Sequence, residues 1–458
     1  MRRSVLRRYC LTQDESNCKL LTIYNQGKFN NKIKNMKNYA ITDIKAIEII
    51  DNRGMPTVRV NVSVDHKFWG KADVPCGSST GSYEARELRD GDARFRGKGV
   101  QKAIQNIHEI LLPKLRGIDA TRQQKIDNLM LELDGTGNKS KLGANAILGV
   151  SLAVAVAAAA ADRLGLYKYL NADARILPVP QACLINGGLH AGNDLDIQEF
   201  CVMPVGAGSF GESVRILCEI FYNLKDILSE KLGKSATNSS EDGGFAPPIS
   251  STRQAMDLLS EAVHHTGYTD KVVYGLDFAA TGFYNPEKDN YNFEGSQKSR
   301  DELIEFIRQL LGDYSSIVSI EDPLHENDLE GMKILTQEFG DHLIIGDDMF
   351  ATNIKRIQEG LKLGAANATI CKVNQIGTLT EALETVNFAR QKNYTVVMSE
   401  RSGETEDSIL SDISVAFNAG LFKTGGIRGS DRGTNYNRFI EIETELGSSA
   451  VYAGENYR

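Results

Sequence analysis

Six short apolar runs in the second half of the chain each end at a charged side chain. The residues that directly follow these runs are Asp277, Glu321, Asp347, Lys372, Glu400 and Lys423. They succeed one another at intervals of 44, 26, 25, 28 and 23 residues, which fits one buried strand, one helix and their turns in each repeat. The pattern favours a parallel α/β barrel, whose active site lies where its strands end.

Three of these strand-end residues suit a hard metal ion. Asp277, Glu321 and Asp347 would offer carboxylate oxygens at one end of the barrel, and neither cysteine nor histidine stands at these positions. All-oxygen ligation favours Mg²⁺ over zinc or copper. The set therefore predicts a magnesium site at the carboxyl ends of the strands.

Lys372 directly follows the apolar run ATIC. Burial at the mouth of a barrel can lower a lysine pKa enough for the amine to act as a base. The alternative is a structural ion pair with a metal-binding acid. Arg401, Ser402 and Lys423 add donors that suit a phosphate or a carboxylate, so the pattern favours metal-assisted proton abstraction.

The body of the chain is acidic and its cysteines are scattered. Residues 1–37 hold nine Lys or Arg and two acids, a net charge of +7, so with −8 overall the remainder carries −15. This charge argues against a nucleic-acid surface. The seven cysteines include no CxxC, which argues against a disulfide framework or structural zinc and fits a reducing compartment.

The basic segment at residues 1–38 has two interpretations. Its start, MRRSVLRRYCLTQ, is arginine-rich and acid-free like a mitochondrial transit peptide, whereas KFNNKIKNMKN is typical of a disordered polar tail. We expect a disordered extension on a cytoplasmic protein, with mitochondrial import as the alternative. The alanine-rich run Ala146–Ala161 is shorter than the ~20 residues of a membrane span, so it predicts a packed helix and no membrane partner.

Residues 39–176 predict a separate α+β domain. The runs AIEII, TVRVNVSV and FWGKADV predict strands of a hairpin-rich sheet, with a turn at Gly54–Pro56. Helical spacing follows over Gly99–Leu115, Gln123–Asp134 and Ala144–Leu166. A proline-bounded strand at Leu177–Pro180 opens the second domain, and we place the barrel at residues 177–458.

Gly206, Gly208 and Gly211 match GxGxxG after the strand-like FCVMPV and before a helical run. This spacing formally meets the dinucleotide-binding fingerprint. No second doubly wound βαβ half follows, and the barrel repeat accounts for the downstream chain. An ordinary βα turn is therefore the favoured interpretation.

From about Tyr39 to its end, the chain resembles the enolase (phosphopyruvate hydratase) family, as a divergent member of eukaryotic type. The motifs that carry the resemblance are STG at Ser79–Gly81, ELRDGD at Glu87–Asp92, NKSKLGANAILGVSLA from Asn138, INGGxHAGN at Ile185–Asn193, QEF at Gln198–Phe200, SIEDP at Ser319–Pro323, KVNQIGTLTE from Lys372 and RSGETED at Arg401–Asp407. The resemblance implies an α/β fold, with an α+β N-terminal cap domain followed by an enolase-type (β/α)8 TIM-like barrel. It also implies dehydration of 2-phosphoglycerate to phosphoenolpyruvate in glycolysis and gluconeogenesis.

Matched residue by residue, the resemblance implies roles for the strand-end set and for several loop positions. Lys372 would take the C2 proton of the substrate, with two Mg²⁺ ions in each active site stabilising the negative charge that develops. The implied metal ligands are Asp277, Glu321 and Asp347 for the first ion and Ser79 for the second. The implied substrate-binding residues are His190, Gln198, Glu199, Arg401, Ser402 and Lys423.

One catalytic position departs from the family pattern in the loop that the family writes G-D-E-G-G. Here the loop reads S-E-D-G-G, and Asp242 stands where a glutamate acts as the general acid that helps to expel the C3 hydroxyl. Aspartate reaches about 1.5 Å less far, and a displacement of ~1 Å can cost ~10²-fold in rate. We therefore expect slower elimination.

The second departure is Glu400, where the family carries a histidine near the substrate. An ionised Glu400 would repel the substrate phosphate, so we expect either a raised pKa for its carboxyl group or a nearby cation. Arg428 stands where enolases usually carry a small residue and is the candidate cation, although the usual arginine beside it is Gly429 here.

The resemblance also implies a homodimer that is held by two ion pairs between subunits. At the matching positions this chain has Arg59 with Glu441, the charges exchanged, and Ile47 with Thr444, both charges absent. In each of the two pairs, both residues differ from those usual in the family. We therefore expect a homodimer that rejects ordinary enolase subunits.

Three functions stay open at this point. The favoured one is a working Mg²⁺-dependent enolase, slowed to the extent that Asp242 and Glu400 impose. An impaired paralogue that serves as a binding or structural protein is motivated by the same two residues. A related lyase that acts on another carboxylate is disfavoured, because Arg401 and Ser402 suit a substrate that bears phosphate.

Overall fold

The structure, a computed structural model, describes residues 39–78 and 81–458. Within it, Tyr39–Arg458 forms one compact unit. The basic segment at residues 1–38 and the predicted metal ligand Ser79 lie outside the described residues, so the expectations for them stay predictions.

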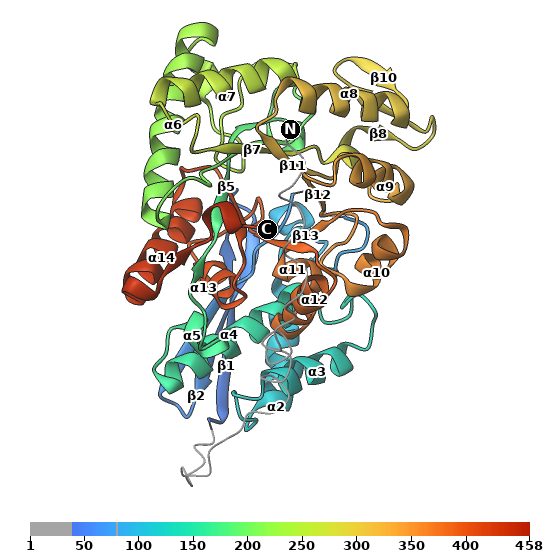
Figure 1. Ribbon diagram of the computed structural model, residues 1–458. Helices are drawn as coiled ribbons and strands as arrows, with labels where there is room; N and C mark the ends of the chain where they lie inside the picture. The colour runs from blue at the N-terminus through green and yellow to red at the C-terminus, as the bar shows by residue number, and fades with distance from the viewer. Residues whose placement is uncertain (1–38, 79–80) are drawn as a thin grey trace, which may run out of the picture. The chain divides into compact units, whose positions relative to one another are not determined.

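A closed barrel of eight strands forms the centre of the C-terminal part of this unit (Figure 1). Around the barrel the strands follow the order β11-β12-β13-β14-β15-β5-β6-β7. Their bounds are β5 (Val179–Asn186), β6 (Glu199–Met203), β7 (Val273–Asp277), β11 (Ile317–Glu321), β12 (Leu343–Gly346), β13 (Ala368–Cys371), β14 (Thr395–Ser399) and β15 (Leu421–Gly425). The six apolar runs form β7 and β11 to β15, so the strand repeat predicted from the sequence is confirmed.

One barrel strand, β6, runs against both of its neighbours. It pairs antiparallel with β5 and with β7, whereas the other neighbouring barrel strands are parallel. The expectation of an all-parallel barrel is therefore wrong at this strand. Residues 187–198 connect β5 to β6 and form no α-helix, only the short 3₁₀ turn Gly188–His190. The chain therefore lacks the helical crossover that usually joins parallel strands.

Helices connect the remaining strands on the outside of the barrel (Figure 1). Their bounds are α6 (Phe210–Leu232), α7 (Thr252–Thr266), α8 (Arg300–Asp313), α9 (Leu329–Glu338), α10 (Ile354–Leu363), α11 (Val373–Ile376), α12 (Leu379–Gln391), α13 (Ile409–Ala416) and α14 (Ser430–Leu446). A small antiparallel sheet of β8 (Tyr284–Asn285), β9 (Asn290–Phe293) and β10 (Ser296–Lys298) precedes α8. From β11 onward each strand is followed by a helix that returns the chain for the next parallel strand.

The GxGxxG stretch at Gly206–Gly211 covers the turn after β6 and the first two residues of α6. Ser209 caps α6 by accepting a hydrogen bond from the Glu212 backbone N–H. Because β6 is an antiparallel strand of a closed barrel, no βαβ dinucleotide unit is formed. The interpretation as an ordinary βα turn is confirmed.

The N-terminal part of the unit is a three-stranded antiparallel sheet that packs against helices. The strands β1 (Ile41–Ile50), β2 (Pro56–Val64) and β3 (Phe68–Asp73) lie in that order. The helices are α1 (Gln101–Asn106), α2 (Leu112–Leu115), α3 (Gln123–Asp134), α4 (Ala144–Asp162) and α5 (Leu166–Leu170), and a π-helical segment joins α1 to α2. Two further strands, β4 (Ile176–Leu177) and β16 (Val451–Tyr452), pair with each other beside the barrel. The predicted order of strands first and helices after is confirmed.

The alanine-rich helix α4 packs on β2 and β3. It is long and apolar enough to cross a membrane by length and composition, but 89% of its most apolar stretch is buried inside the protein. The predicted packed helix is confirmed. It ends at Asp162, before the predicted Leu166, because Arg163 adopts a left-handed conformation with φ 59°.

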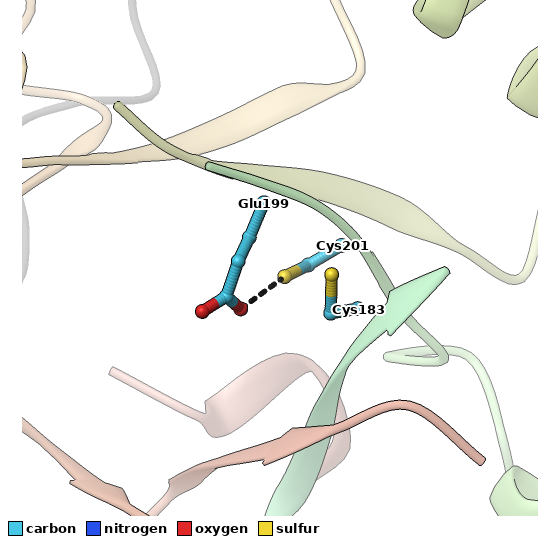
Figure 2. Close-up of side chains that lie close together, drawn as sticks. All are labelled: Cys183, Glu199 and Cys201. Carbon is cyan, nitrogen blue, oxygen red and sulfur yellow. Dashed lines mark hydrogen bonds between the residues drawn. The ribbon is translucent and has the colours of Figure 1, made fainter. Parts of the chain in front are cut away.

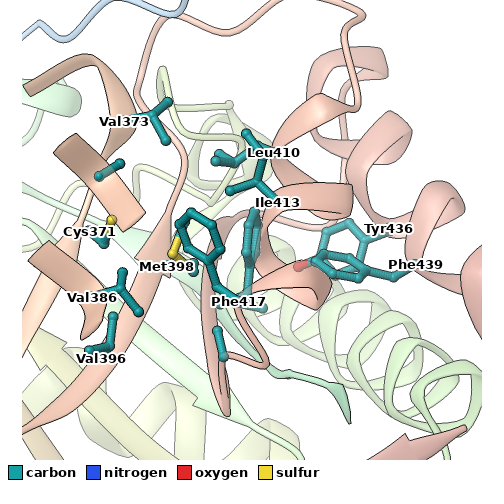
Figure 3. Packing of buried hydrophobic residues seen from close by; sticks show 14 of the residues in the cluster. Cys371, Val373, Val386, Val396, Met398, Leu410, Ile413, Phe417, Tyr436 and Phe439 are labelled. Atoms are coloured by element: carbon teal, nitrogen blue, oxygen red, sulfur yellow. The ribbon is translucent and has the colours of Figure 1, made fainter. Parts of the chain in front are cut away.

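An apolar core lies between the last barrel strands and the helices that cover them (Figure 3). Met398 of β14 lies beside Phe417, which follows α13, and Phe439 of α14 contributes on the other side. The rings of Phe422 and Phe439 meet edge to face, with centroids 5.0 Å apart. This packing fixes the ends of β14 and β15, which carry charged residues toward the candidate site.

Gly70 of β3 lies so close to α4 that a Cβ atom would stand 2.2 Å from both the Ala153 carbonyl oxygen and the Ala157 nitrogen. We expect Gly70→Ala to force β3 and α4 apart and to lower the free energy of unfolding by about 3 kcal/mol. Gly137→Ala is the matched control, because a Cβ there would meet nothing within 4 Å. Urea unfolding followed by circular dichroism provides the measurement, and equal midpoints for the two variants would contradict this packing.

Candidate active site

The strand-end residues meet at one end of the barrel. Asp277 and Glu321 are the last residues of β7 and β11, and Lys372 and Glu400 directly follow β13 and β14. Nine of the predicted site residues line one cavity there: His190, Gln198, Glu199, Asp242, Lys372, Glu400, Arg401, Ser402 and Lys423. The structure therefore brings together residues that lie more than 200 positions apart in the sequence.

Lys423 of β15 holds three carboxylates together. Its Nζ lies 2.6 Å from an Asp277 oxygen, 2.9 Å from a Glu321 oxygen and 3.2 Å from a Glu199 oxygen. Burial opposes the charge on the amine, but attraction to these acids raises the pKa of Lys423 well above its ordinary value. Gln198 Nε2 donates a further hydrogen bond of 3.1 Å to Asp277.

Lys372 forms a buried ion pair with Asp347. Gln375 Nε2 donates to the other oxygen of the same carboxylate at 2.9 Å. Burial opposes the positive charge, yet attraction to Asp347 raises the pKa of Lys372 overall. The expectation of a lowered pKa is therefore wrong for this structure, which shows instead the ion pair that the sequence left open.

Asp322, which the sequence analysis did not single out, positions the neighbouring pair of acids. Its two oxygens accept the backbone N–H groups of Asp347 at 3.0 Å and of Asp348 at 2.7 Å. Carboxylate oxygens of the three residues lie within 4.8 Å of one another. Burial and the charge of Asp347 raise the pKa of Asp348 to about 7, which shows how much negative charge this group concentrates.

The carboxylates at this end of the barrel fit a divalent cation. Asp277, Glu321 and Asp347 are buried, and Glu321 Oε2 has no hydrogen-bond partner within residues 39–78 and 81–458. Burial, together with the charge of Asp277, raises the pKa of Glu321 well above its ordinary value. Such a set of hard oxygen donors, short of positive partners, is suited to a divalent metal ion.

Asp242 is held as a carboxylate by its neighbours. His190 Nδ1 is hydrogen-bonded to Asp242 Oδ2, and Asn186 Nδ2 donates to the same oxygen at 3.2 Å. Burial favours the neutral acid, but the charge of His190 and its hydrogen bond lower the pKa of Asp242 to about 2. Burial likewise opposes the charge on His190, while attraction to Asp242 raises its pKa overall. Each side chain therefore favours the charged form of the other.

Glu400 is paired with a cation, but not with the one expected. Arg432 of α14 places Nη1 2.7 Å from Glu400 Oε1. Arg428 instead stacks on Phe245, with 4.9 Å between its guanidinium carbon and the ring centroid, and donates to the Thr237 carbonyl oxygen. The prediction that Arg428 neutralises Glu400 is therefore wrong, because its side chain is directed toward the barrel wall rather than toward the cavity.

The wall around Arg401 and Ser402 is completed by the N-terminal part of the chain. Arg401 Nη1 donates to Glu84 at 3.0 Å, and Ser402 Oγ accepts the Ser78 backbone N–H at 2.8 Å. A Cβ atom at Gly77 would stand 1.7 Å from the Arg401 guanidinium. The backbone at Gly77 can thus approach the guanidinium only because no side chain intervenes.

Two thiols lie against Glu199 in the barrel interior (Figure 2). Cys183 of β5 and Cys201 of β6 are directly opposite partners on adjacent strands, and Cys201 Sγ lies 3.6 Å from Glu199 Oε2. Burial raises the pKa of both thiols, which keeps them neutral. All five cysteines within the described part of the chain are free, as expected without a disulfide framework.

Three residues of the site were not predicted from the sequence, namely Asp322, Glu84 and Arg432. Asp322 and Glu84 act through contacts with segments far away in the sequence. Arg432 lies only four residues beyond Arg428 in the sequence, near the start of α14. Its pairing with Glu400 nevertheless depends on how α14 docks on the barrel.

Comparison with known protein families matches both parts of the chain. The family described as Enolase, N-terminal domain matches residues 41–170, and that described as Enolase, C-terminal TIM barrel domain matches residues 174–458. Curated relatives named Enolase occur in Methanocaldococcus jannaschii (51% identical; 92% of this chain and 99% of the relative), Pyrococcus furiosus (50%; 92% and 98%) and Corynebacterium kroppenstedtii (48%; 91% and 98%). These relatives do not test the expectation of a eukaryotic-type member.

The contribution of the His190–Asp242 pair to the free energy of unfolding is expected to depend on pH. The raised pKa of His190 gives stability that is full below pH ~6.5 and is lost as pH rises through the folded-state value. The pKa of Asp242, lowered to about 2, gives stability that is full above pH ~4 and is lost as pH falls toward 2. The contribution of the pair is thus largest between pH ~4 and ~6.5.

We expect Asp242→Asn to lower the free energy of unfolding by about 3 kcal/mol in that window, because it leaves a buried charge unpaired. The loss should shrink as pH rises above the window. Asp226→Asn, at an exposed position, is the control. Urea unfolding across pH 4–9, together with NMR titration of the seven histidines, provides the measurement, and a pKa of His190 unchanged by Asp242→Asn would contradict the pair.

Proposed function

Since this chain belongs to the enolase family, we propose that it is a phosphopyruvate hydratase, the lyase that dehydrates 2-phosphoglycerate to phosphoenolpyruvate in glycolysis and gluconeogenesis. One observation carries the proposal. Lys372, Lys423 and the pair Arg401–Ser402 line one cavity. The two lysines contact the buried acids behind them, which are Asp347 for Lys372 and Asp277 and Glu321 for Lys423. Removal of a proton next to a carboxylate needs a base and concentrated positive charge, and this arrangement supplies places for both.

We propose magnesium as the divalent ion, with Asp277, Glu321 and Asp347 as its ligands and Ser79 as a ligand of a second ion. All-oxygen donors support this choice. A bound ion would supply positive charge that offsets the charge building up on the substrate carboxylate.

The chain's own residues then take the following roles. The Lys372 amine removes the proton from C2, and Lys423 binds the substrate carboxylate. Arg401 and Ser402 bind the phosphate through charge-assisted hydrogen bonds. Asp242 occupies the position of the family's general acid. The roles proposed for His190, Gln198 and Glu199 are to line the substrate pocket.

A catalytically impaired paralogue with a binding or structural role is the second candidate. It is motivated by Asp242, whose pKa of about 2 leaves no proton to donate near neutral pH. The pairing of Glu400 with Arg432 at 2.7 Å favours an adapted site instead. In a site that no longer served catalysis, nothing would retain a buried cation beside this buried acid. A lyase for another carboxylate has no such observation in its favour.

We propose that the protein is a homodimer that uses Arg59 and Glu441. The Glu441 side chain is exposed, and it contacts Arg438 in its own chain at 3.0 Å. Arg59 is held by Asp73 through two hydrogen bonds of 2.6 Å, which presents its guanidinium in a fixed position. We also propose a cytoplasmic location, which the acidic body and the free cysteines support.

Lys372→Ala is expected to lower turnover of 2-phosphoglycerate by at least ~10³-fold, since the variant has no base within reach of C2. Lys355→Ala, at the exposed start of α10, serves as the control and should retain activity. Formation of phosphoenolpyruvate with Mg²⁺ is followed by absorbance. If the wild type shows no turnover, the second candidate function replaces the first; if Lys372→Ala turns over normally, the proposed base is wrong.

Glu441→Arg is expected to shift the protein from dimer toward monomer, because the new arginine would face Arg59 of the other subunit. Glu445→Arg is a matched control, since Glu445 contacts the same Arg438 at 2.8 Å within the chain. Native mass spectrometry at micromolar concentration distinguishes the states. A monomeric wild type, or equal dissociation of the two variants, would contradict the proposed pair.

The same method tests whether the interface excludes ordinary enolase subunits. The protein is co-expressed with an enolase that carries the family's usual charges, and we expect the two kinds of homodimer with few mixed dimers. Abundant mixed dimers would show that the exchanged charges do not select the partner.

A further inference from the structure

Two buried acids, Asp242 and Glu400, share the guanidinium of Arg432. Its Nη1 lies 2.7 Å from Glu400 Oε1, and its Nη2 lies 3.5 Å from Asp242 Oδ1. Arg432 is itself fully buried. It is fixed by hydrogen bonds to the carbonyl oxygens of Arg401 at 2.7 Å and of Ser402 at 3.0 Å.

The two acids differ in how many positive or hydrogen-donating neighbours they have. Asp242 receives hydrogen bonds from His190 and Asn186 in addition to the contact with Arg432. Both of its oxygens are therefore occupied, which favours the carboxylate form. An acid in this state has no proton to give to a leaving group.

Glu400 has only one of its oxygens occupied. Its Oε2 is buried and has no hydrogen-bond partner in the part of the chain that the structure describes, and Glu400 lines the cavity that Lys372 also lines. The charged groups around it are Arg432 and three acids, Glu404, Asp242 and Asp431; burial raises the pKa of Glu400, Arg432 opposes this rise, and the acids add to it. These surroundings favour protonation of Glu400 more than protonation of Asp242, and the unpartnered Oε2 is the oxygen that can carry the proton.

The backbone makes room for Glu400 at this place. A Cβ atom at position 425 would stand 2.2 Å from Glu400 Oε1, and Gly425 has a φ of +64° that favours glycine. The Glu400 side chain therefore fits between Arg432 and the cavity only because Gly425 lacks a side chain.

We propose that Glu400, and not Asp242, is the catalytic acid that protonates the leaving hydroxyl in this protein. The inference deepens the proposed function and rests on it. After Lys372 has removed the C2 proton, the electron pair left at C2 forms the C2–C3 double bond and the C3–O bond breaks. The oxygen takes the Glu400 proton and leaves as water, and Glu400 becomes a carboxylate paired with Arg432. Glu400 then regains a proton from solvent before the next turnover.

A catalytic role for Glu400 explains both positions at which the chain departs from the family pattern, Asp242 and Glu400. The proton donor has moved from the loop position 242 to the end of β14 at position 400. Asp242 becomes a positioning residue, which holds His190 in its charged form at the cavity wall. Environments that push the pKa values of two neighbouring acids apart are the general means by which one site separates these roles.

The experiment separates proton removal from elimination. 2-Phosphoglycerate is incubated in D₂O with Mg²⁺ and the full-length protein, and NMR follows deuterium at C2 together with phosphoenolpyruvate. Wild type should show both reactions. We expect Glu400→Gln to retain C2 exchange while elimination falls by ~10²-fold or more, the usual contribution of a general acid. Asp242→Asn should lower the ratio of elimination to exchange much less.

The outcomes are distinguishable. A wild type that neither exchanges nor eliminates refutes the proposed function, and this inference with it. If wild type is active and Asp242→Asn lowers the ratio as much as Glu400→Gln does, the inference alone is overturned.

A second pair of variants keeps the test informative if Glu400→Gln fails to fold, which thermal unfolding would show. Glu400→His removes the acid from position 400 and should depress elimination by ~10²-fold. Adding Asp242→Glu places an acid of full length at the other position and should restore at least tenfold. If Glu400→His is as active as wild type and Asp242→Glu adds nothing to it, Glu400 is not the acid.

Discussion

The structure depends on one electrostatic constraint, the concentration of buried carboxylates at the end of the barrel. Asp277, Glu199 and Glu321 converge on the single amine of Lys423, and Asp347 is held by Lys372. Charges removed from water in this way are costly unless each finds an opposite partner. The lysines supply part of that charge, and Glu321 Oε2, without a partner among the described residues, marks where more is needed.

This constraint also explains why the strands end as they do. A parallel strand delivers its last side chain to the same rim as its neighbours, so acids and lysines that lie far apart in the sequence meet there. The apolar packing behind them, with Met398 and Phe439 among its members (Figure 3), fixes the strand ends. Because this apolar core fixes the strand ends, the acids at the end of the barrel stay close together although their negative charges repel one another.

The sequence was sufficient for the features that depend on periodicity. The strand repeat, the α+β arrangement of the N-terminal part and the packed α4 all follow from local pattern, and each is present. The antiparallel direction of β6 was missed because an apolar run such as FCVMPV is compatible with both parallel and antiparallel pairing. The partner of Glu400 was missed for a different reason. Arg428 and Arg432 lie only four residues apart in the sequence, and the sequence does not show which of the two side chains reaches Glu400. The local sequence also suggested a lowered pKa for Lys372, which the ion pair with Asp347 reverses.

The proposed function therefore rests on whether the carboxylate group takes up a divalent ion. The most direct test is calorimetric titration of Mg²⁺ into the wild type and Glu321→Gln, with Glu455→Gln at an exposed position near the C-terminus as the control. The account predicts saturable binding to the wild type and the control, and binding at least tenfold weaker in Glu321→Gln. No uptake by the wild type, or equal affinity in all three proteins, would contradict it.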